Sequence, residues 1–210
     1  MLKVSTYFAV FLVLICPGFG QTGPTASEYA VYGTVLRTIY AENRKTYSNA
    51  SEFVIVDRTL RSDATNTPTA RKFRNLVKHF GSLNQSEHPI AKKLPRGEYS
   101  NEYHLISQAD IDKLFIEGKA ENDLRTEDAK KKNLLTVIDQ CGSTHWRPFY
   151  RKFPEASGYY QLSRAAISNN FALVRIKRKD TCSGFDNTYL LQRTRTGWRA
   201  VWSRGSFWVA

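Results

Sequence analysis

Residues 158–204 decide the fold of this chain, and they read GYYQLSRAAISNNFALVRIKRKDTCSGFDNTYLLQRTRTGWRAVWSR. Apolar and polar residues alternate here with a period of two, as in strands that bury one face. The alternation predicts four strands: Tyr159–Ala166, Phe171–Lys177, Thr188–Arg193 and Trp198–Arg204. Turn residues separate them, in two short connectors (168–170 and 195–197) and one longer connector (179–187). We therefore expect an antiparallel meander.

Before Gly158, apolar residues recur at spacings of three and four, which is typical of helices. The spacing predicts helices at Ser27–Glu42, at Ala70–Phe80 with Gly81 as its end, from Ser107 to about Gly118, and within Trp146–Phe153. Short apolar runs predict strands at Glu52–Val56 and Tyr103–Ile106. The run Asn133–Ile138 fits either a strand or a helix, and we favour a strand.

Helices followed by antiparallel strands predict an α+β fold. We expect N-terminal helices and short strands packed on a C-terminal antiparallel meander of four to five strands. One domain should span residues 21–210, with its helical part at about 27–120 and its meander at about 158–208.

The first twenty residues match a cleaved secretory signal. Lys3 forms a short basic start, an apolar run extends from Val4 to Cys16, and Pro17 breaks it. Small residues then precede a cut after Gly20. The apolar run is too short for a membrane span, so we expect a secreted or periplasmic protein with no transmembrane segment after cleavage.

Positive charge is concentrated in the last third of the chain. Residues 141–210 contain twelve Lys/Arg and three Asp/Glu, a net charge of +9, whereas residues 21–140 contain eighteen and sixteen, a net charge of +2. This asymmetry predicts an anionic partner without identifying it.

Cleavage of the signal would remove Cys16 and leave Cys141 and Cys182. An even pair in an exported chain predicts a disulfide, which would stabilise the fold by about 4 kcal/mol. The alternative is two separate buried thiols. A Cys/His metal site lacks sufficient ligands, because only His145 lies near Cys141.

The C-terminal half contains the motifs Tyr103-His104-Leu105-Ile106-Ser107, Phe153-Pro154, Leu162-Ser163-Arg164, Tyr189-Leu190-Leu191 and Gly197-Trp198. Together these motifs resemble a conserved but uncharacterised family of bacterial secreted proteins. The resemblance implies an exported α+β domain and no particular chemistry. The pair Ser163-Arg164 is polar within an apolar strand, and we expect Arg164 to satisfy nearby carbonyls or a carboxylate, with ligand binding as the alternative.

The basic and aromatic residues of the predicted meander form the candidate ligand-binding surface. These residues are Arg175, Lys177, Arg178, Lys179, Arg193, Arg195, Arg199 and Trp202. Cations beside ring faces suit a cell-surface glycan, a nucleic acid or an anionic lipid. The alternative is a solvated basic face whose aromatic residues belong to the core.

No catalytic, phosphate-binding or dinucleotide motif occurs in the sequence, and we predict no cofactor and no metal. A non-enzymatic binding protein is therefore the first hypothesis. The alternative is a secreted hydrolase whose site forms from residues distant in sequence, such as His145 with Glu155. Asp180 and Asp186 alone are too few ligands for a cation site.

Overall fold

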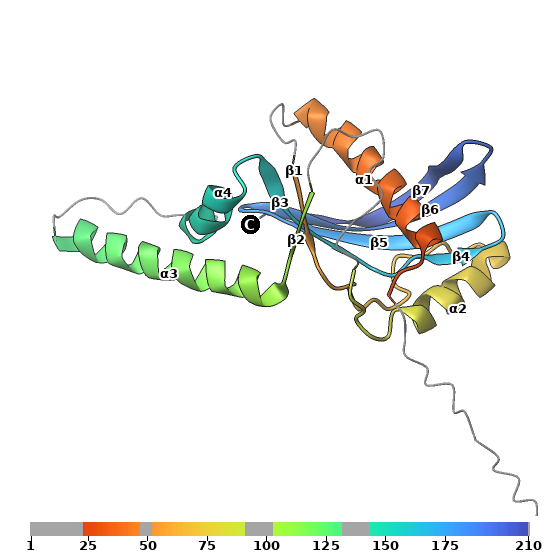
Figure 1. Ribbon diagram of the computed structural model, residues 1–210, viewed down its shortest axis with the longest axis horizontal. Coiled ribbons are helices and arrows are strands. Elements are labelled where there is room, and N and C mark those ends of the chain that lie inside the picture. The colour runs from red at the N-terminus through yellow and green to blue at the C-terminus, as the bar shows by residue number, and fades with distance from the viewer. Residues whose placement is uncertain (1–22, 47–51, 91–102, 132–142, 210) are drawn as a thin grey trace, which may run out of the picture.

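The computed structural model of the chain describes residues 23–46, 52–90, 103–131 and 143–209 (Figure 1). Its helices are α1 (Ala26–Thr46), α2 (Arg74–Leu83), α3 (Gln108–Lys131) and α4 (Arg147–Lys152), with 3-10 turns η1 (Arg71–Phe73) and η2 (Ser143–Trp146). Its strands are β1 (Glu52–Val56), β2 (Tyr103–Ile106), β3 (Ala156–Leu162), β4 (Ala166–Ser168), β5 (Phe171–Lys179), β6 (Ser183–Thr194) and β7 (Gly197–Val209).

All seven strands belong to one sheet, in the order β2-β1-β3-β5-β6-β7, and β4 also pairs with β5. The strands from β3 onward pair antiparallel, which confirms the predicted α+β fold with its C-terminal meander. The pairs β1–β2 and β1–β3 are parallel. The two N-terminal strands therefore extend the meander instead of forming a separate layer.

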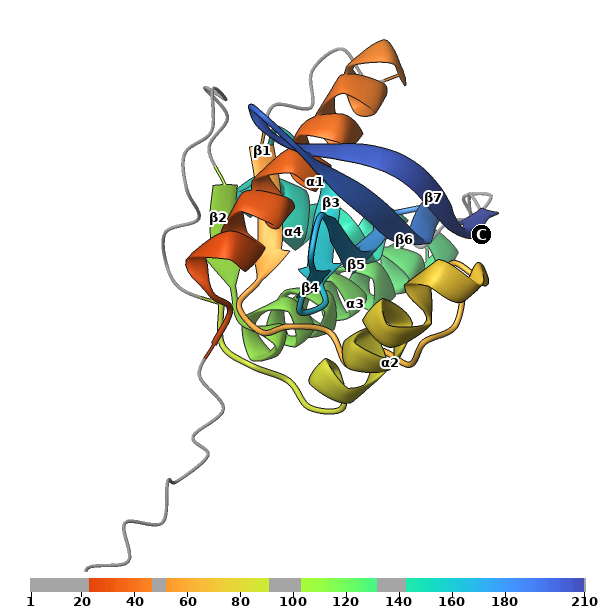
Figure 2. The ribbon, with the colours of Figure 1, turned by 90° about the vertical axis from the view of Figure 1, so that its right-hand side faces the viewer.

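Helices cover both faces of the sheet (Figures 1 and 2). We call the side under α1 the first face: Val35, Leu36 and Ile39 of this helix pack there against Tyr160 and Val174. We call the opposite side the second face, and its helices form two separate clusters. One cluster joins α2 to β4, β5 and β6, and the other joins α3 and α4 to β1, β2 and β3.

The connection between β5 and β6 is much shorter than the predicted segment 179–187. β5 continues to Lys179 and β6 begins at Ser183. The carboxylate of Asp180 closes this turn, because its Oδ1 accepts hydrogen bonds from the backbone N–H groups of Cys182 (3.0 Å) and Ser183 (2.6 Å).

The predicted strand Tyr159–Ala166 is two strands in the structure. β3 ends at Leu162 and β4 begins at Ala166, and both pair with β5. The polar pair Ser163-Arg164 lies in the break between these two strands. Its polar side chains therefore do not belong to a strand, contrary to what the sequence had suggested. Their hydrogen bonds are to other parts of the fold.

The sequence predicted that helices end at Gly81 and at Gly118, and both predictions were wrong. The helix at 70–80 continues past Gly81 to Leu83, and the side chain of Asn84 then satisfies its end by donating to the carbonyl of Phe80 (2.9 Å). Gly118 lies inside α3 and not at its end. A Cβ there would stand 2.2 Å from the carbonyl oxygen of His145, so this glycine allows η2 to contact the helix.

Several predictions concern residues outside those that the structure describes. They are the signal segment 1–20, the strand Asn133–Ile138 and Cys141. The pairing of Cys141 with Cys182 therefore stays a prediction. Within the described ranges, no helix has both the length and the apolar character that crossing a membrane requires.

Replacing two of the glycines inside helices, Gly118 and Gly33, by alanine should have opposite effects on stability. Gly118→Ala should destabilise the protein by about 1–3 kcal/mol, because the new methyl group collides with the backbone of His145. Gly33→Ala in α1 is the matched control: nothing lies within 4 Å of its Cβ position, so better helix propensity should stabilise by about 0.5–1 kcal/mol. Urea unfolding monitored by circular dichroism measures both. Equal effects of the two changes would contradict the proposed contact.

Stability should decrease at alkaline pH. Burial raises the pKa values of Tyr32, Tyr150, Tyr159 and Tyr189 in the folded protein. Above the ordinary tyrosine pKa of about 10, these phenols ionise in the unfolded chain first, so the stability from burying them is present below about pH 10 and decreases as pH rises. Urea midpoints at about pH 8 and about pH 11 measure this loss. The loss should be smaller in Tyr32→Phe, and an unchanged midpoint would contradict it.

Candidate anion-binding surface

The alternation of β5 assigns its side chains to the two faces. Leu173 packs on the second face with α2, whereas Ala172, Val174 and Ile176 pack on the first face with α1. Arg175 and Lys177, which alternate with these residues, therefore lie on the second face. The period of two along a strand thus fixes the face of each β5 side chain.

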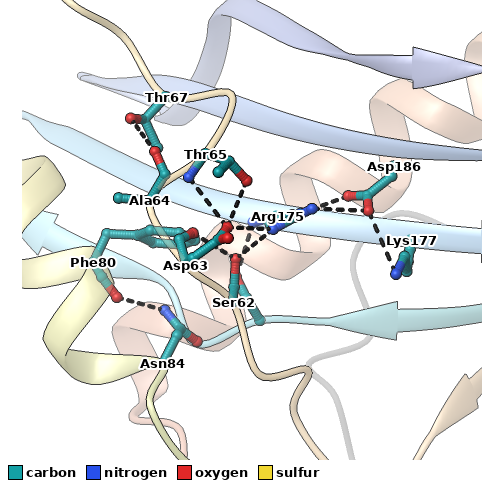
Figure 3. Close-up of polar contacts among 11 residues, drawn as sticks. Ser62, Asp63, Ala64, Thr65, Thr67, Phe80, Asn84, Arg175, Lys177 and Asp186 are labelled. Carbon is teal, nitrogen blue, oxygen red and sulfur yellow. Dashed lines mark hydrogen bonds and ion pairs between the residues drawn. The ribbon is translucent and has the colours of Figure 1, made fainter.

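Arg175 is the centre of a polar network on the second face (Figure 3). Its guanidinium donates to both carboxylate oxygens of Asp186, from Nε to Oδ1 at 2.6 Å and from Nη2 to Oδ2 at 2.9 Å. Its Nη1 donates to Ser62 Oγ (3.0 Å) and Asp63 Oδ1 (3.1 Å). The hydrogen bonds to Asp186 raise the pKa of Arg175. With its side chain only 14% exposed, Arg175 orders the sheet and the loop above it instead of presenting a charge to a ligand.

The acidic side chains of this network are neutralised by ion pairs with its own cations. Lys177 Nζ lies 3.5 Å from Asp186 Oδ2, which the Arg175 guanidinium also contacts. Asp63 is exposed, and hydrogen bonds from Thr65, with a smaller effect of Arg175, lower its pKa. Two cations and two carboxylates thus cancel within the network. A ligand on this face would meet the cations around the network and no unneutralised acid from it.

Arg178 is buried on the first face. Of the cations predicted for the ligand-binding surface, it departs most from that role. Its Nε donates to the carbonyl of Ser157 (3.1 Å), and its Nη2 contacts the Asp180 carboxylate that closes the β5–β6 turn. Its guanidinium also lies 5.9 Å from the ring centroid of Phe185. The alternation forces this placement, because Arg178 is an odd number of positions from Arg175 and Lys177.

The remaining predicted cations lie at two ends of the sheet. Lys179 is exposed at the β5–β6 turn, next to Lys177 on the second face. Arg193, Arg195 and Arg199 are exposed around the β6–β7 turn, at the opposite end. The structure thus divides the predicted surface into separate parts.

A concavity of about 540 Å³ lies on the second face between the loop before η1 and strands β5 to β7. Two cations border it, Lys72 from η1 and Arg204 from β7. Aromatic rings line it as well, including Phe73, Phe171 and Trp202. Gln192 and the hydroxyl residues Thr67 and Thr69 supply uncharged hydrogen-bonding groups. We call this the α2-side concavity.

A smaller concavity of about 310 Å³ lies nearer the β5–β6 turn, and we call it the turn-side concavity. It is lined by Tyr159, Gln161, Lys177, Arg178, Lys179 and Trp208. Trp208 packs over Gly184, where a Cβ would come within 2.2 Å of the indole. Thr188 lies between Arg175 and Arg204 in the register, and its buried Oγ1 has no hydrogen-bond partner among the described residues. The second face therefore carries polar groups between its two concavities.

Sequence reasoning placed Trp202 and Arg204 on the last strand of the candidate surface, with Trp208 after them, but missed Lys72. Lys72 follows a polar loop far from the meander in sequence, and only the tertiary fold places it opposite Arg204. Trp208 lies beyond the predicted end of the last strand, which continues to Val209. Arg204 lies on the same side of β7 as Trp202.

Comparisons with protein-family models, with curated proteins and with solved structures found no match. The resemblance to a bacterial secreted family therefore stays a prediction.

Removing the central guanidinium should destabilise the fold strongly. Arg175→Met should lower the free energy of unfolding by about 3 kcal/mol or more, because it leaves the buried Asp186 with only the more distant Lys177. Adding Asp186→Asn should restore at least about half of that loss, since no buried charge then remains.

Lys177→Met is the matched control, and because Lys177 is 42% exposed it should cost less than about 1 kcal/mol. Chemical denaturation of the four proteins gives these values. Similar losses for Arg175→Met and Lys177→Met would refute the central role of Arg175.

Proposed function

We propose that this is an exported, non-enzymatic binding protein that holds an acidic glycan on the second face of its sheet. The α2-side concavity is the primary site. The observation that carries the proposal is the arrangement there: Lys72 and Arg204 border an aromatic hollow, while Arg175 neutralises the acids of the same face.

The lining chemistry supports an acidic sugar. A carboxylate or sulfate group would lie between the two cations, where charge-assisted hydrogen bonds are strongest. A sugar ring is apolar on its faces and polar at its edge, so it can lie against Trp202 while Gln192 and Thr69 bond its hydroxyls. The size of the hollow suits one or two sugar units, and the turn-side concavity offers a second place for a longer chain.

The distribution of cations favours a glycan over a nucleic acid or a lipid surface. Nucleic acid binding draws its affinity from a track of cations that follows successive phosphates. Among the described strand residues the cations form no such track, because Arg193, Arg195 and Arg199 lie at one end of the sheet and Lys177 and Lys179 at the other. A flat membrane surface would not enter a hollow between η1 and β7.

The same lining favours binding over hydrolysis. None of the described residues that line the two concavities is His, Cys, Asp or Glu. Glycoside hydrolysis ordinarily requires a pair of carboxyl groups around the scissile bond. His145, the candidate general base of the alternative hypothesis, lies in η2 against α3 and lines neither concavity.

Charge reversal in the α2-side concavity should weaken glycan binding. In calorimetric titrations of residues 21–210 with polygalacturonate, Lys72→Glu and Arg204→Glu should each weaken affinity by about tenfold or more. Raising the salt concentration from about 50 mM to about 500 mM should weaken binding by the wild-type protein as well. Lys78→Glu is the matched control, since Lys78 is exposed on α2 but lines neither concavity.

The competing partners give distinguishable results in the same experiment. Neutral dextran should not bind, and single-stranded DNA and anionic vesicles should bind more weakly than polygalacturonate. Preference for DNA or vesicles, or equal losses in Lys72→Glu and Lys78→Glu, would refute the proposed site.

A further inference from the structure

Strand β7 is a long edge of the sheet. In the strand order it lies at the end opposite β2, and among the described residues it pairs only with β6. It runs over thirteen residues, Gly197–Val209, whereas β2 at the other edge has four. The outer side of β7 therefore presents backbone N–H and C=O groups along an extended strand. Such an edge is a template for pairing with another chain.

The C-terminal part of the edge lacks the features that normally prevent such pairing. Native edges are protected by short length, proline, charged side chains or β-bulges. β7 contains no proline, but it carries Arg199 and Arg204 and a bulge that leaves Val201 without a partner on β6, and all three lie before its last five residues. Its apolar side chains also remain open, with Phe207 68% exposed and Val209 67% exposed. The C-terminal part of the edge is thus both apolar and available.

The register of β7 defines what an added strand would meet. After the bulge, Trp202, Arg204 and Trp208 point to the second face. Phe207 and Val209, at alternate positions, point to the first face. A strand laid along this edge would alternate in the same way. Residues opposite Arg204 should be acidic, and residues opposite Phe207 should be apolar.

We propose that β7 is a docking strand for an extended segment of another protein in which acidic and apolar residues alternate. The segment adds to the sheet as a further antiparallel or parallel strand, with its acids toward Arg204 and its apolar residues toward Phe207. Backbone hydrogen bonds supply affinity and the alternating side chains supply selectivity. The segment approaches from the sheet edge and shares Arg204, but not Lys72, with the glycan site.

Charge distinguishes this occupant from a second copy of the chain. Two β7 strands paired with each other would bring together strands that carry Arg199 and Arg204 and no acid. Each copy of residues 21–210 also has a net charge of +11, the sum of the +9 and +2 of its two segments, which opposes self-association. An acidic segment is complementary to the same strand.

The test uses the mature chain and a fluorescein-labelled peptide of about eight alternating glutamate and valine residues. Fluorescence anisotropy should show binding, and a matched peptide with alternate backbone nitrogens methylated should bind at least about tenfold more weakly, since it keeps every charge but loses N–H donors. Hydrogen exchange should show new protection of amides within Gly197–Val209. Arg204→Glu should weaken binding, while Lys72→Glu, which disrupts the glycan site, should leave it unchanged.

Three results would overturn the proposal. The methylated peptide could bind as tightly as the parent, or a block peptide of the same composition could do so, and either would show attraction by charge alone. Peptide binding could occur without new protection in β7. Sedimentation could show a dimer with β7 amides already protected in the absence of peptide, which would assign the edge to a second copy.

Discussion

The buried ion pair between Glu28 and Arg164 is the interaction on which the assembly of the layers depends. The guanidinium donates from Nε and Nη2 to the two carboxylate oxygens at 2.9 and 2.8 Å, and both side chains are nearly inaccessible. These hydrogen bonds raise the pKa of Arg164. Such a pair contributes little net stability compared with apolar packing, but losing one partner would cost about 3–5 kcal/mol because the other charge would remain buried. It therefore fixes where the first turn of α1 meets the break between β3 and β4.

Further hydrogen bonds extend this junction to α2 and β5. Asn84, at the end of α2, accepts from the backbone N–H of Arg164 (2.6 Å) and donates to its carbonyl (3.1 Å). The hydroxyl of Tyr32 donates to the carbonyl of Ser163 (2.9 Å), and Ser163 Oγ accepts from the backbone N–H of Arg175 (2.8 Å). The main chain that positions the second-face network is thus held by the residues that hold α1. Asn84 matches a glycosylation acceptor pattern in sequence, yet its buried amide is used here in the fold.

Local patterns predicted the elements well, and pairing between distant elements poorly. The strands Glu52–Val56 and Tyr103–Ile106 have the bounds predicted from their apolar runs, since a buried strand depends on its own side chains. That both are parallel neighbours in the meander sheet could not be predicted, because no local pattern encodes which edge a strand joins. Gly118 shows the same limit: in sequence it resembles a helix end, and only the nearby backbone of His145 explains it.

The net charge counted in the C-terminal segment is larger than the charge that this segment exposes in the folded protein. That segment has twelve cations and three acids, but Arg164, Arg175 and Arg178 are all held by carboxylates inside the structure. Two of the carboxylates that hold them, Glu28 and Asp63, come from the nearly neutral N-terminal part. Which cations remain exposed therefore depends on which arginines form ion pairs in the core and in the second-face network. Selectivity for an anion then depends on where cations such as Lys72 and Arg204 stand relative to the aromatic rings, and the total charge of the segment contributes mainly long-range attraction.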